Sequence, residues 1–314
     1  MINIYRTDNR IISEIDYIEE GCWVMMTAPT LEETTQIAKE CNVDIADLRD
    51  ALDDEESSRI ELEEDYTFVL VDIPIQEVRN NRDTYTTIPL GIIIKEDMLI
   101  TVCAQDTVVL RTFIKQRVRD FSTKKQTRFT YQILFNSVMV YQSLLRSIDR
   151  KRYDIEDRIQ QDSTEDEDLM HLHDLESNLV YFATSLRANG LVLDRLTRYG
   201  RIRKFEEDQD LLEDLIIENK QAIEMTAIYR EVITGTRELL SAVINNRLNN
   251  AMKYLASITI VMSIPTIISG LWGMNVSGKW IPFADTRHGF GIICLITLII
   301  SVISMIVLRK RKML

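Results

Sequence analysis

Nineteen consecutive residues without a charge, YLASITIVMSIPTIISGLW at positions 254–272, decide how this chain is organised. A second uncharged run of twenty residues, GFGIICLITLIISVISMIVL, occupies positions 289–308. Each run has about the length that a helix needs to cross roughly 30 Å of hydrocarbon. The sequence therefore predicts two transmembrane helices, 254–272 and 289–308, joined by a short loop over residues 273–288.

Basic side chains beside the two runs predict their orientation. Arg247 and Lys253 precede the first run, and the chain closes on the basic tail RKRKML at positions 309–314. Basic residues are retained on the cytoplasmic side of a membrane. The first ten residues also lack the basic and then apolar layout of a signal peptide. We therefore expect a multi-pass protein of the cell (plasma) membrane, in contact with lipid, with both termini in the cytoplasm and an extracellular loop.

Charge and motif content exclude several classes of function. The chain has 37 basic and 49 acidic residues, which gives a net charge of −12. Nucleic acid is not expected as a partner, because duplex binding needs a basic face. The four cysteines form no C-x-x-C pair, so neither a disulfide framework nor a structural zinc site is expected. Neither a glycine-rich phosphate-binding motif nor a nucleophile–base pair stands out, so the chain is not expected to be an enzyme.

The first 120 residues alternate between strand-like and helix-like patterns, which predicts a cytoplasmic α/β domain over residues 1–120. Four apolar runs rich in β-branched residues predict the strands Cys22–Met26, Tyr66–Ile75, Ile88–Ile94 and Leu99–Cys103. Helical spacing predicts helices over Leu31–Glu40, after Pro29-Thr30, and over Ile45–Leu52.

Strand signals disappear after Asp106, and the rest of the cytoplasmic part is expected to be helical. Residues 121–204 predict a helical hairpin with a polar turn at 161–165. A stalk helix is expected over residues 205–253, continuing into the first transmembrane helix. Its apolar residues at heptad spacing predict a seam for packing in an oligomer. These residues are Met225, Ile228, Val232, Leu239 and Val243.

Small and polar residues of the first transmembrane run follow helical spacing. Thr259, Ser263, Thr266, Gly270 and Gly273 are separated by steps of four and three residues, which places them on one helix face. Such a stripe can serve close packing between helices, for which small residues suffice. It can also line a pore between symmetry-related copies. Because two helices cannot enclose an aqueous path alone, a pore requires an oligomer.

Several motifs together resemble the CorA family of divalent-cation channels. Gly273-Met274-Asn275 closes the first transmembrane run, and NNAMKYL at positions 249–255 resembles the family's entry to that helix. The basic tail matches as well, and the segments beginning at Asp50, Ser58 and Asp65 resemble the family's helix-to-strand passage. The resemblance implies a funnel-shaped homopentamer that conducts Mg²⁺, with Co²⁺ or Ni²⁺ passed by some members.

The resemblance also implies roles for particular residues. The selectivity filter would comprise Gly273, Met274 and Asn275. The pore would be lined by Asn249, Met252, Leu255, Thr259, Ser263, Thr266 and Gly270. Cytoplasmic Mg²⁺, which is then both cargo and regulator, would bridge Asp50 of one subunit and Asp214 of its neighbour and hold the channel closed. The loop departs from the family because it lacks an acidic Met-Pro-Glu-type motif.

Two other functions remain open at the level of sequence. The first is transport of zinc or another transition metal on the same scaffold, although the stripe offers no thiolate or imidazole for a softer ion. The second is a non-conducting, membrane-anchored coiled-coil scaffold. A scaffold would need the apolar heptads, but it would have no use for Asn275 or for a stripe of hydroxyl groups.

Overall fold

The computed structural model describes residues 1–79, 82–161, 163–164, 167–198, 206–274, 282–283, 286–311 and 313, which form two compact units, Met1–Arg237 and Glu238–Leu314. The first unit contains, in chain order, β1 (Ile2–Asp8), β2 (Ile11–Ile15), β3 (Cys22–Thr27), α1 (Leu31–Glu40), α2 (Ile45–Asp50), β4 (Arg59–Leu62), β5 (Thr67–Arg79), β6 (Arg82–Ile94), β7 (Met98–Cys103), α3 (Val108–Ile114), α4 (Gln126–Gln160) and α5 (Asp168–Arg198). Helix α6 (Glu206–Trp272) begins in the first unit and ends in the second, which also contains α7 (Gly289–Lys310).

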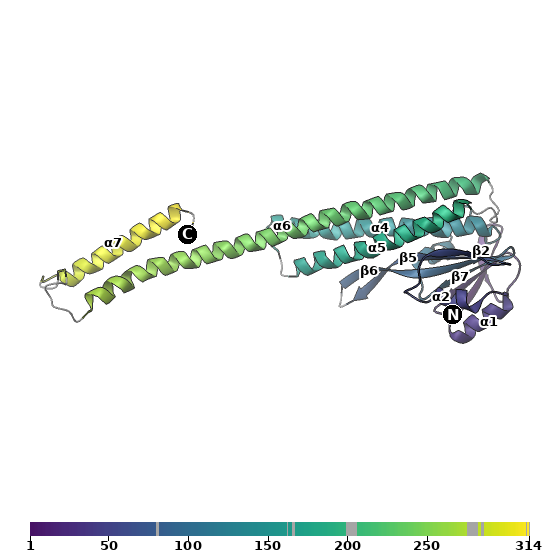
Figure 1. Cartoon of the computed structure of the whole chain (residues 1–314), viewed down its shortest axis with the longest axis horizontal. Coiled ribbons are helices and arrows are strands. Elements are labelled where there is room, and N and C mark those ends of the chain that lie inside the picture. Colours follow the sequence, from purple (N-terminus) through teal and green to yellow (C-terminus); the bar gives the residue numbers. More distant parts are fainter. Residues whose placement is uncertain are drawn as a thin grey trace. The chain divides into compact units, whose positions relative to one another are not determined.

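A seven-stranded sheet with the order β2-β1-β3-β7-β6-β5-β4 occupies the centre of the first unit. Strands β3 and β7 pair in parallel, whereas the other neighbours pair antiparallel. On one face, Val24, Leu70 and Val102 are buried in a core that includes Ile37 of α1 and Leu48 of α2. Figure 1 shows α1 and α2 on this side of the sheet and α4 and α5 on the other.

Aromatic side chains fill the opposite face of the sheet beneath α3 and α4. Trp23 donates its indole N–H to the hydroxyl of Thr101 at 2.9 Å. Its ring meets that of Phe129 edge to face, with centroids 5.0 Å apart, and Phe121 lies 4.6 Å from Phe129 on the same measure. Edge-to-face aromatic pairs add to the free energy gained by burying their surface. This cluster fixes the start of α4 to the sheet.

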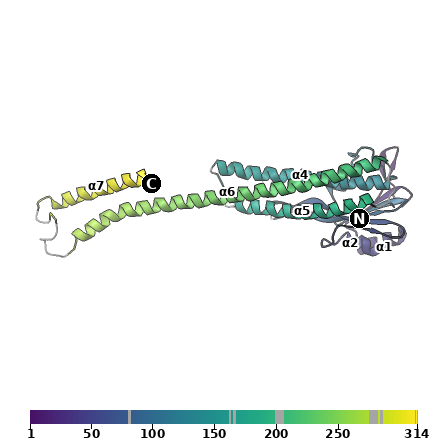
Figure 2. The same ribbon diagram turned by 45° about the horizontal axis from the view of Figure 1, so that its top comes forward.

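Helices α4, α5 and α6 lie side by side within the first unit in both views of the ribbon (Figures 1 and 2). Gln142 of α4 donates to the carboxylate of Glu218 at 2.7 Å. Asn219 donates to the carbonyl of Leu186 in α5 at 3.1 Å. The first unit is therefore an α/β sheet domain joined to a three-helix layer, and α6 is the helix that leaves it.

The second unit pairs the end of α6 with α7. The rings of Trp272 and Phe290 lie 6.0 Å apart, and the hydroxyl of Ser257 donates to the carbonyl of Met313 at 2.9 Å. These contacts at the two ends make the helices antiparallel. Both helices are long and apolar enough to cross a membrane, and the side chains of their apolar windows are largely exposed in the single chain. Such exposure is not expected of a core helix in a water-soluble domain.

The strongest sequence patterns are confirmed. Helix α1 has the predicted bounds, and its N-cap Thr30 forms a capping box with Glu33. Helix α2 ends at Asp50, two residues earlier than expected. Strand β5 continues to Arg79, beyond the expected end at Ile75, because polar residues such as Glu77 pair with β6 in a ribbon.

The hairpin of β1 and β2 was not predicted. Its turn residues Asn9 and Arg10 both have positive φ, at 52° and 67°, which is the backbone of a type I′ turn. The second position of such a turn usually carries glycine. Because Arg10 stands there, the sequence lacks the Asn-Gly pair that would have predicted a hairpin.

Candidate functional site

One face of α6, called here the polar stripe, lies opposite α7. The polar stripe consists of Thr259, Ser263, Thr266, Gly270 and Gly273. The face towards α7 is identified by burial: Ser257 is fully buried, and Val261, Ile264 and Ile268 are half-buried. With about 3.6 residues per turn, these four residues share one side of the helix and the polar stripe falls about half a turn away. Ser263 is half-buried, and the other four residues of the stripe are exposed.

The hydroxyl groups of the polar stripe donate to the backbone of α6 itself. Thr259 donates to the carbonyl of Leu255 at 2.9 Å, Ser263 to that of Thr259 at 2.7 Å and Thr266 to that of Met262 at 3.1 Å. A hydroxyl has one donor and two acceptor lone pairs. Because the donor is used within the helix, the oxygen retains capacity to accept. The stripe therefore presents acceptors and no charge.

The other predicted pore residues extend this face in both directions. Met252 and Leu255 continue the spacing of the stripe and are 60% and 66% exposed. Asn249 is also exposed. At the opposite end, a Cβ placed on Gly270 would meet no atom within 4 Å, and Gly273 and Met274 are exposed. Asn275, the third residue of the predicted filter, lies outside the described residues.

The predicted regulatory residue Asp50 already has a cationic partner. Arg59 donates to its carboxylate and also contacts Glu56 at 2.7 Å and Glu61 at 2.5 Å. One guanidinium thus faces three carboxylates, and the side chain of Asp50 is 32% exposed. A cation that binds Asp50 must compete with Arg59, a contact that the sequence analysis missed.

The second predicted regulatory residue, Asp214, is exposed on α6. It belongs to an acidic stretch in which Asp210 and Glu213 are also exposed, whereas Asp208 is buried and contacts Arg128 at 3.4 Å. Within the described part of one chain no contact joins Asp50 to Asp214. The predicted site takes one carboxylate from each of two chains, so a single chain leaves it a prediction. Among the same residues no group of three His, Cys, Asp or Glu could hold a metal ion.

Three of the five residues of the predicted heptad seam of α6 are exposed in the single chain, and Met225 and Val243 are half-buried. Ile228, Val232 and Leu239 are 57%, 40% and 45% exposed, while a different row of α6 is buried. Within the first unit that buried row contains Leu212, Leu215, Ala222 and Ile233. Helix α6 therefore has two apolar faces, of which one has no partner within the described chain.

Known proteins resemble this chain over most of its length. The sequence model of a family described as CorA-like Mg²⁺ transporter protein matches residues 19–310. The cobalt/magnesium transport protein CorA of Methanocaldococcus jannaschii is 29% identical over 297 residues, which are 92% of this chain and 90% of the relative.

Solved structures extend the likeness to the fold. The complete structure of the CorA magnesium transporter from Methanocaldococcus jannaschii matches with a TM-score of 0.81 at 27% identity, covering 99% of this chain and 98% of that one. The full-length CmaX protein matches with a TM-score of 0.70 over 98% and 96% of the two chains. At 18% identity, this second match shows the fold alone.

Proposed function

The chain belongs to the CorA family of Mg²⁺ transporter proteins, and from this membership we propose that it carries Mg²⁺ across a membrane along the polar stripe of α6. One observation supports the path: the hydroxyl-bearing face of α6 is the face that α7 leaves uncovered. A stripe that served only to pack α6 against α7 would face α7 instead.

The chemistry of the stripe suits a hydrated dication. Mg²⁺ loses its water reluctantly and is often bound through water that it retains. Ion-bound water donates hydrogen bonds, and the oxygens of Thr259, Ser263 and Thr266 can accept them because their own hydrogens are used within α6. Neutral acceptors attract the ion without the strong trapping expected of carboxylates. Asn275 would supply the same kind of oxygen at the filter, together with Gly273 and Met274.

The path requires several copies of the chain. Two helices cannot enclose water, and the uncovered seam of α6 offers an apolar surface on which copies can pack. We assign the assembly as a funnel-shaped homopentamer in which α6 surrounds the axis and α7 faces lipid. Met252 and Leu255 would form an apolar constriction on the cytoplasmic side, gating by exclusion of water. The exposure of both residues in the single chain supports this role.

The membrane potential can drive uptake without a chemical fuel. A dication that moves down an inside-negative potential of 100 mV gains about 4.6 kcal/mol, twice the value for a single charge. This proposal places the protein in the plasma membrane with both termini in the cytoplasm, as the basic tail suggests.

Feedback by Mg²⁺ is the proposed means of control. When cytoplasmic Mg²⁺ is high, it would bridge Asp50 and Asp214 of neighbouring subunits and hold α6 in the closed arrangement. When Mg²⁺ falls, repulsion between the carboxylates would loosen the ring. The exposure of Asp214 and the partial exposure of Asp50 support this role, because both carboxylates are accessible to a second chain.

Transport of a transition metal such as cobalt or zinc is the second candidate. The relative from Methanocaldococcus jannaschii is named as a cobalt/magnesium transport protein, which favours Co²⁺ as an additional cargo. Zinc is disfavoured because the polar stripe contains neither thiolate nor imidazole.

Flux into liposomes tests the function directly. Purified full-length protein is reconstituted with a Mg²⁺-sensitive dye inside, and wild type is compared with Asn275→Ala. Mg²⁺ influx in wild type and its loss in the variant are expected, with Co²⁺, Ni²⁺ and Zn²⁺ then ranked by competition. Influx of Zn²⁺ without Mg²⁺ would transfer the assignment to the transition-metal transporter, and absence of all flux would favour the scaffold.

A further inference from the structure

A cavity of about 280 Å³ opens in the first unit, between the β1–β2 turn and the segment that joins α3 to α4. Arg10 and Ile12 line it from the hairpin. The connecting segment contributes Gln116, Arg119, Asp120 and Phe121. None of these residues belongs to the proposed ion path or to the proposed regulatory site.

The charge of this cavity contrasts with that of the chain. Its two guanidinium groups and one carboxylate sum to +1, in a protein of net charge −12. The side chains of Arg10 and Arg119 make no ion pair or hydrogen bond with any residue that the structure describes, and both residues are exposed. Among the other arginines of the unit, Arg59 and Arg152 contact carboxylates, whereas Arg117 is exposed and, within the described residues, also makes no side-chain ion pair. The cavity therefore presents two uncompensated donors of planar, forked geometry.

Three residues that line the cavity have a left-handed backbone conformation. Arg10, Gln116 and Asp120 have φ values of 67°, 53° and 52°. Glycine is usual at the second turn position that Arg10 occupies and directly after a helix C-cap, where Gln116 lies. The left-handed conformation costs a residue with a Cβ roughly 1–2 kcal/mol. A role for these side chains in the cavity would explain why glycine does not stand there.

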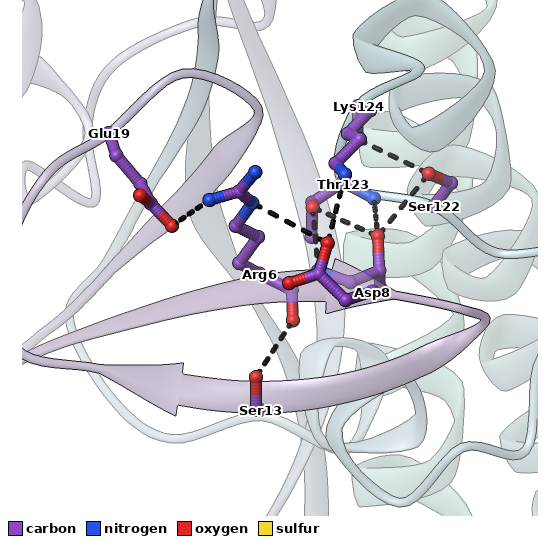
Figure 3. Close-up of polar contacts among 8 residues, drawn as sticks. Arg6, Asp8, Ser13, Glu19, Ser122, Thr123 and Lys124 are labelled. Atoms are coloured by element: carbon purple, nitrogen blue, oxygen red, sulfur yellow. Dashed lines mark hydrogen bonds and ion pairs between the residues drawn. The ribbon is translucent and has the colours of Figure 1, made fainter.

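Polar contacts join β1 to residues 122–124 of the connecting segment (Figure 3). The backbone N–H of Thr7 donates to the hydroxyl of Thr123 at 3.0 Å, and the N–H of Thr123 donates to the hydroxyl of Thr7 at 2.9 Å. Lys124 contacts Asp8 at 2.9 Å beside them. The β1–β2 hairpin and the connecting segment are thus joined next to the cavity, which keeps Arg10 and Arg119 on one site.

We propose that this cavity binds a phosphate-bearing small molecule, with the guanidinium groups of Arg10 and Arg119 donating to phosphate oxygens. Arginine matches phosphate because its parallel N–H groups can bind two oxygens at once. Gln116 adds an amide donor, and Asp120 is the one carboxylate in the lining. The volume of about 280 Å³ lies just below the roughly 300–1,000 Å³ of drug-sized ligand sites, which suits a smaller ligand such as phosphate or diphosphate.

The position of the cavity favours a free phosphate over a lipid headgroup. Arg128 near the start of α4 contacts Asp208, so the adjoining segment lies by the start of α6. From Asp208 to Arg237 the helix extends about 44 Å at 1.5 Å per residue. Within the first unit, the cavity is therefore at the end opposite the one where α6 leaves.

Calorimetric titration of the full-length protein in detergent tests the proposal. The probes are inorganic phosphate, pyrophosphate and tripolyphosphate, added without Mg²⁺ at constant ionic strength. Arg10→Gly removes one donor while giving the turn the residue it favours, so it should fold at least as well as wild type. Arg119→Gln removes the other donor. Arg117→Gln is the matched control, since it makes the same charge change two residues away without lining the cavity.

We expect saturable binding of at least one probe, weakened about tenfold or more by Arg10→Gly and by Arg119→Gln and less than twofold by Arg117→Gln. If all three variants weaken probe binding equally, the binding arises from general electrostatic attraction of anions, and the proposed site is refuted. Absence of binding by every probe would overturn it as well. Vesicles with phosphatidic acid form the last arm, and binding of these vesicles alone, lost in Arg10→Gly, would assign the site to lipid instead. Each readout is independent of ion flux, so failure of transport would leave the result intact.

Discussion

Replacement of Arg59 by glutamine should make the protein more sensitive to inhibition by internal Mg²⁺. Arg59 now neutralises Asp50, and a bridging Mg²⁺ ion must displace it. The side chains of Arg59 and Asp50 are 23% and 32% exposed, so their interaction is screened by water and contributes about 1 kcal/mol at most. Because about 1.4 kcal/mol corresponds to tenfold in an equilibrium constant, the concentration of Mg²⁺ that halves the flux should fall by up to about fivefold.

The assay measures Mg²⁺ influx into liposomes loaded with increasing internal Mg²⁺. Arg111→Gln serves as the control, because it removes the same charge from a pair with Asp106 that is remote in sequence from Asp50. Arg59→Lys retains a point charge and should shift the half-inhibitory concentration less than glutamine does. An unchanged or higher half-inhibitory concentration in Arg59→Gln, with normal flux at low Mg²⁺, would refute the role assigned to Asp50.

Three further changes test contacts inside the first unit or inside the second, each in the full-length protein. Gly91→Ala should lower the free energy of unfolding by about 1–3 kcal/mol, since its Cβ would lie 2.5 Å from that of Ala51; a urea midpoint equal to wild type would contradict this. Ser257→Ala should speed hydrogen exchange at the end of α7, because the carbonyl of Met313 loses its donor and about 1 kcal/mol of stabilisation; unchanged exchange would show that the bond contributes little. Burial raises the pKa of Asp72, so its carboxyl group stays protonated to higher pH in the folded state than in the unfolded chain. The free energy of unfolding therefore decreases as pH rises above about 3.9, the pKa of the unfolded chain, towards the raised pKa of the folded state. Asp72→Asn should therefore lose less stability than wild type as pH rises above about 4, and an identical pH profile would oppose the assignment.

The elements that could be predicted are those whose side-chain pattern reports burial directly. Strand β7, from Met98 to Cys103, is a continuous apolar run because both of its faces are covered. The start of helix α1 can be predicted because Thr30 and Glu33 have the spacing of a capping box. The polar stripe also follows from spacing alone, because steps of four and three residues place its members on one helix face.

Features that depend on contacts between distant residues could not be predicted from the sequence. Strand β1 is half-polar, and its turn carries Arg10 where glycine would have marked a hairpin. The contact of Arg59 with Asp50 joins the end of α2 to the start of β4, and charge alone does not say which of many carboxylates an arginine meets. The sequence also does not predict whether α7 packs on the polar stripe or on the opposite face of α6, because periodicity defines a face but not the element that contacts it.

The claim that the polar stripe lines the ion path is tested most directly by replacing one hydroxyl on each side of the α6–α7 pair. Thr266 lies on the stripe and donates to Met262, whereas Thr297 lies on α7 and makes the same local bond to Ile293 at 2.8 Å. Both are changed to valine, and Mg²⁺ influx into liposomes is compared with wild type. Thr266→Val removes one acceptor from each subunit. Even a single net loss of about 1 kcal/mol should slow influx at least about fivefold, whereas Thr297→Val should leave influx unaffected. Equal influx in the two variants, or loss in Thr297→Val alone, would contradict the account.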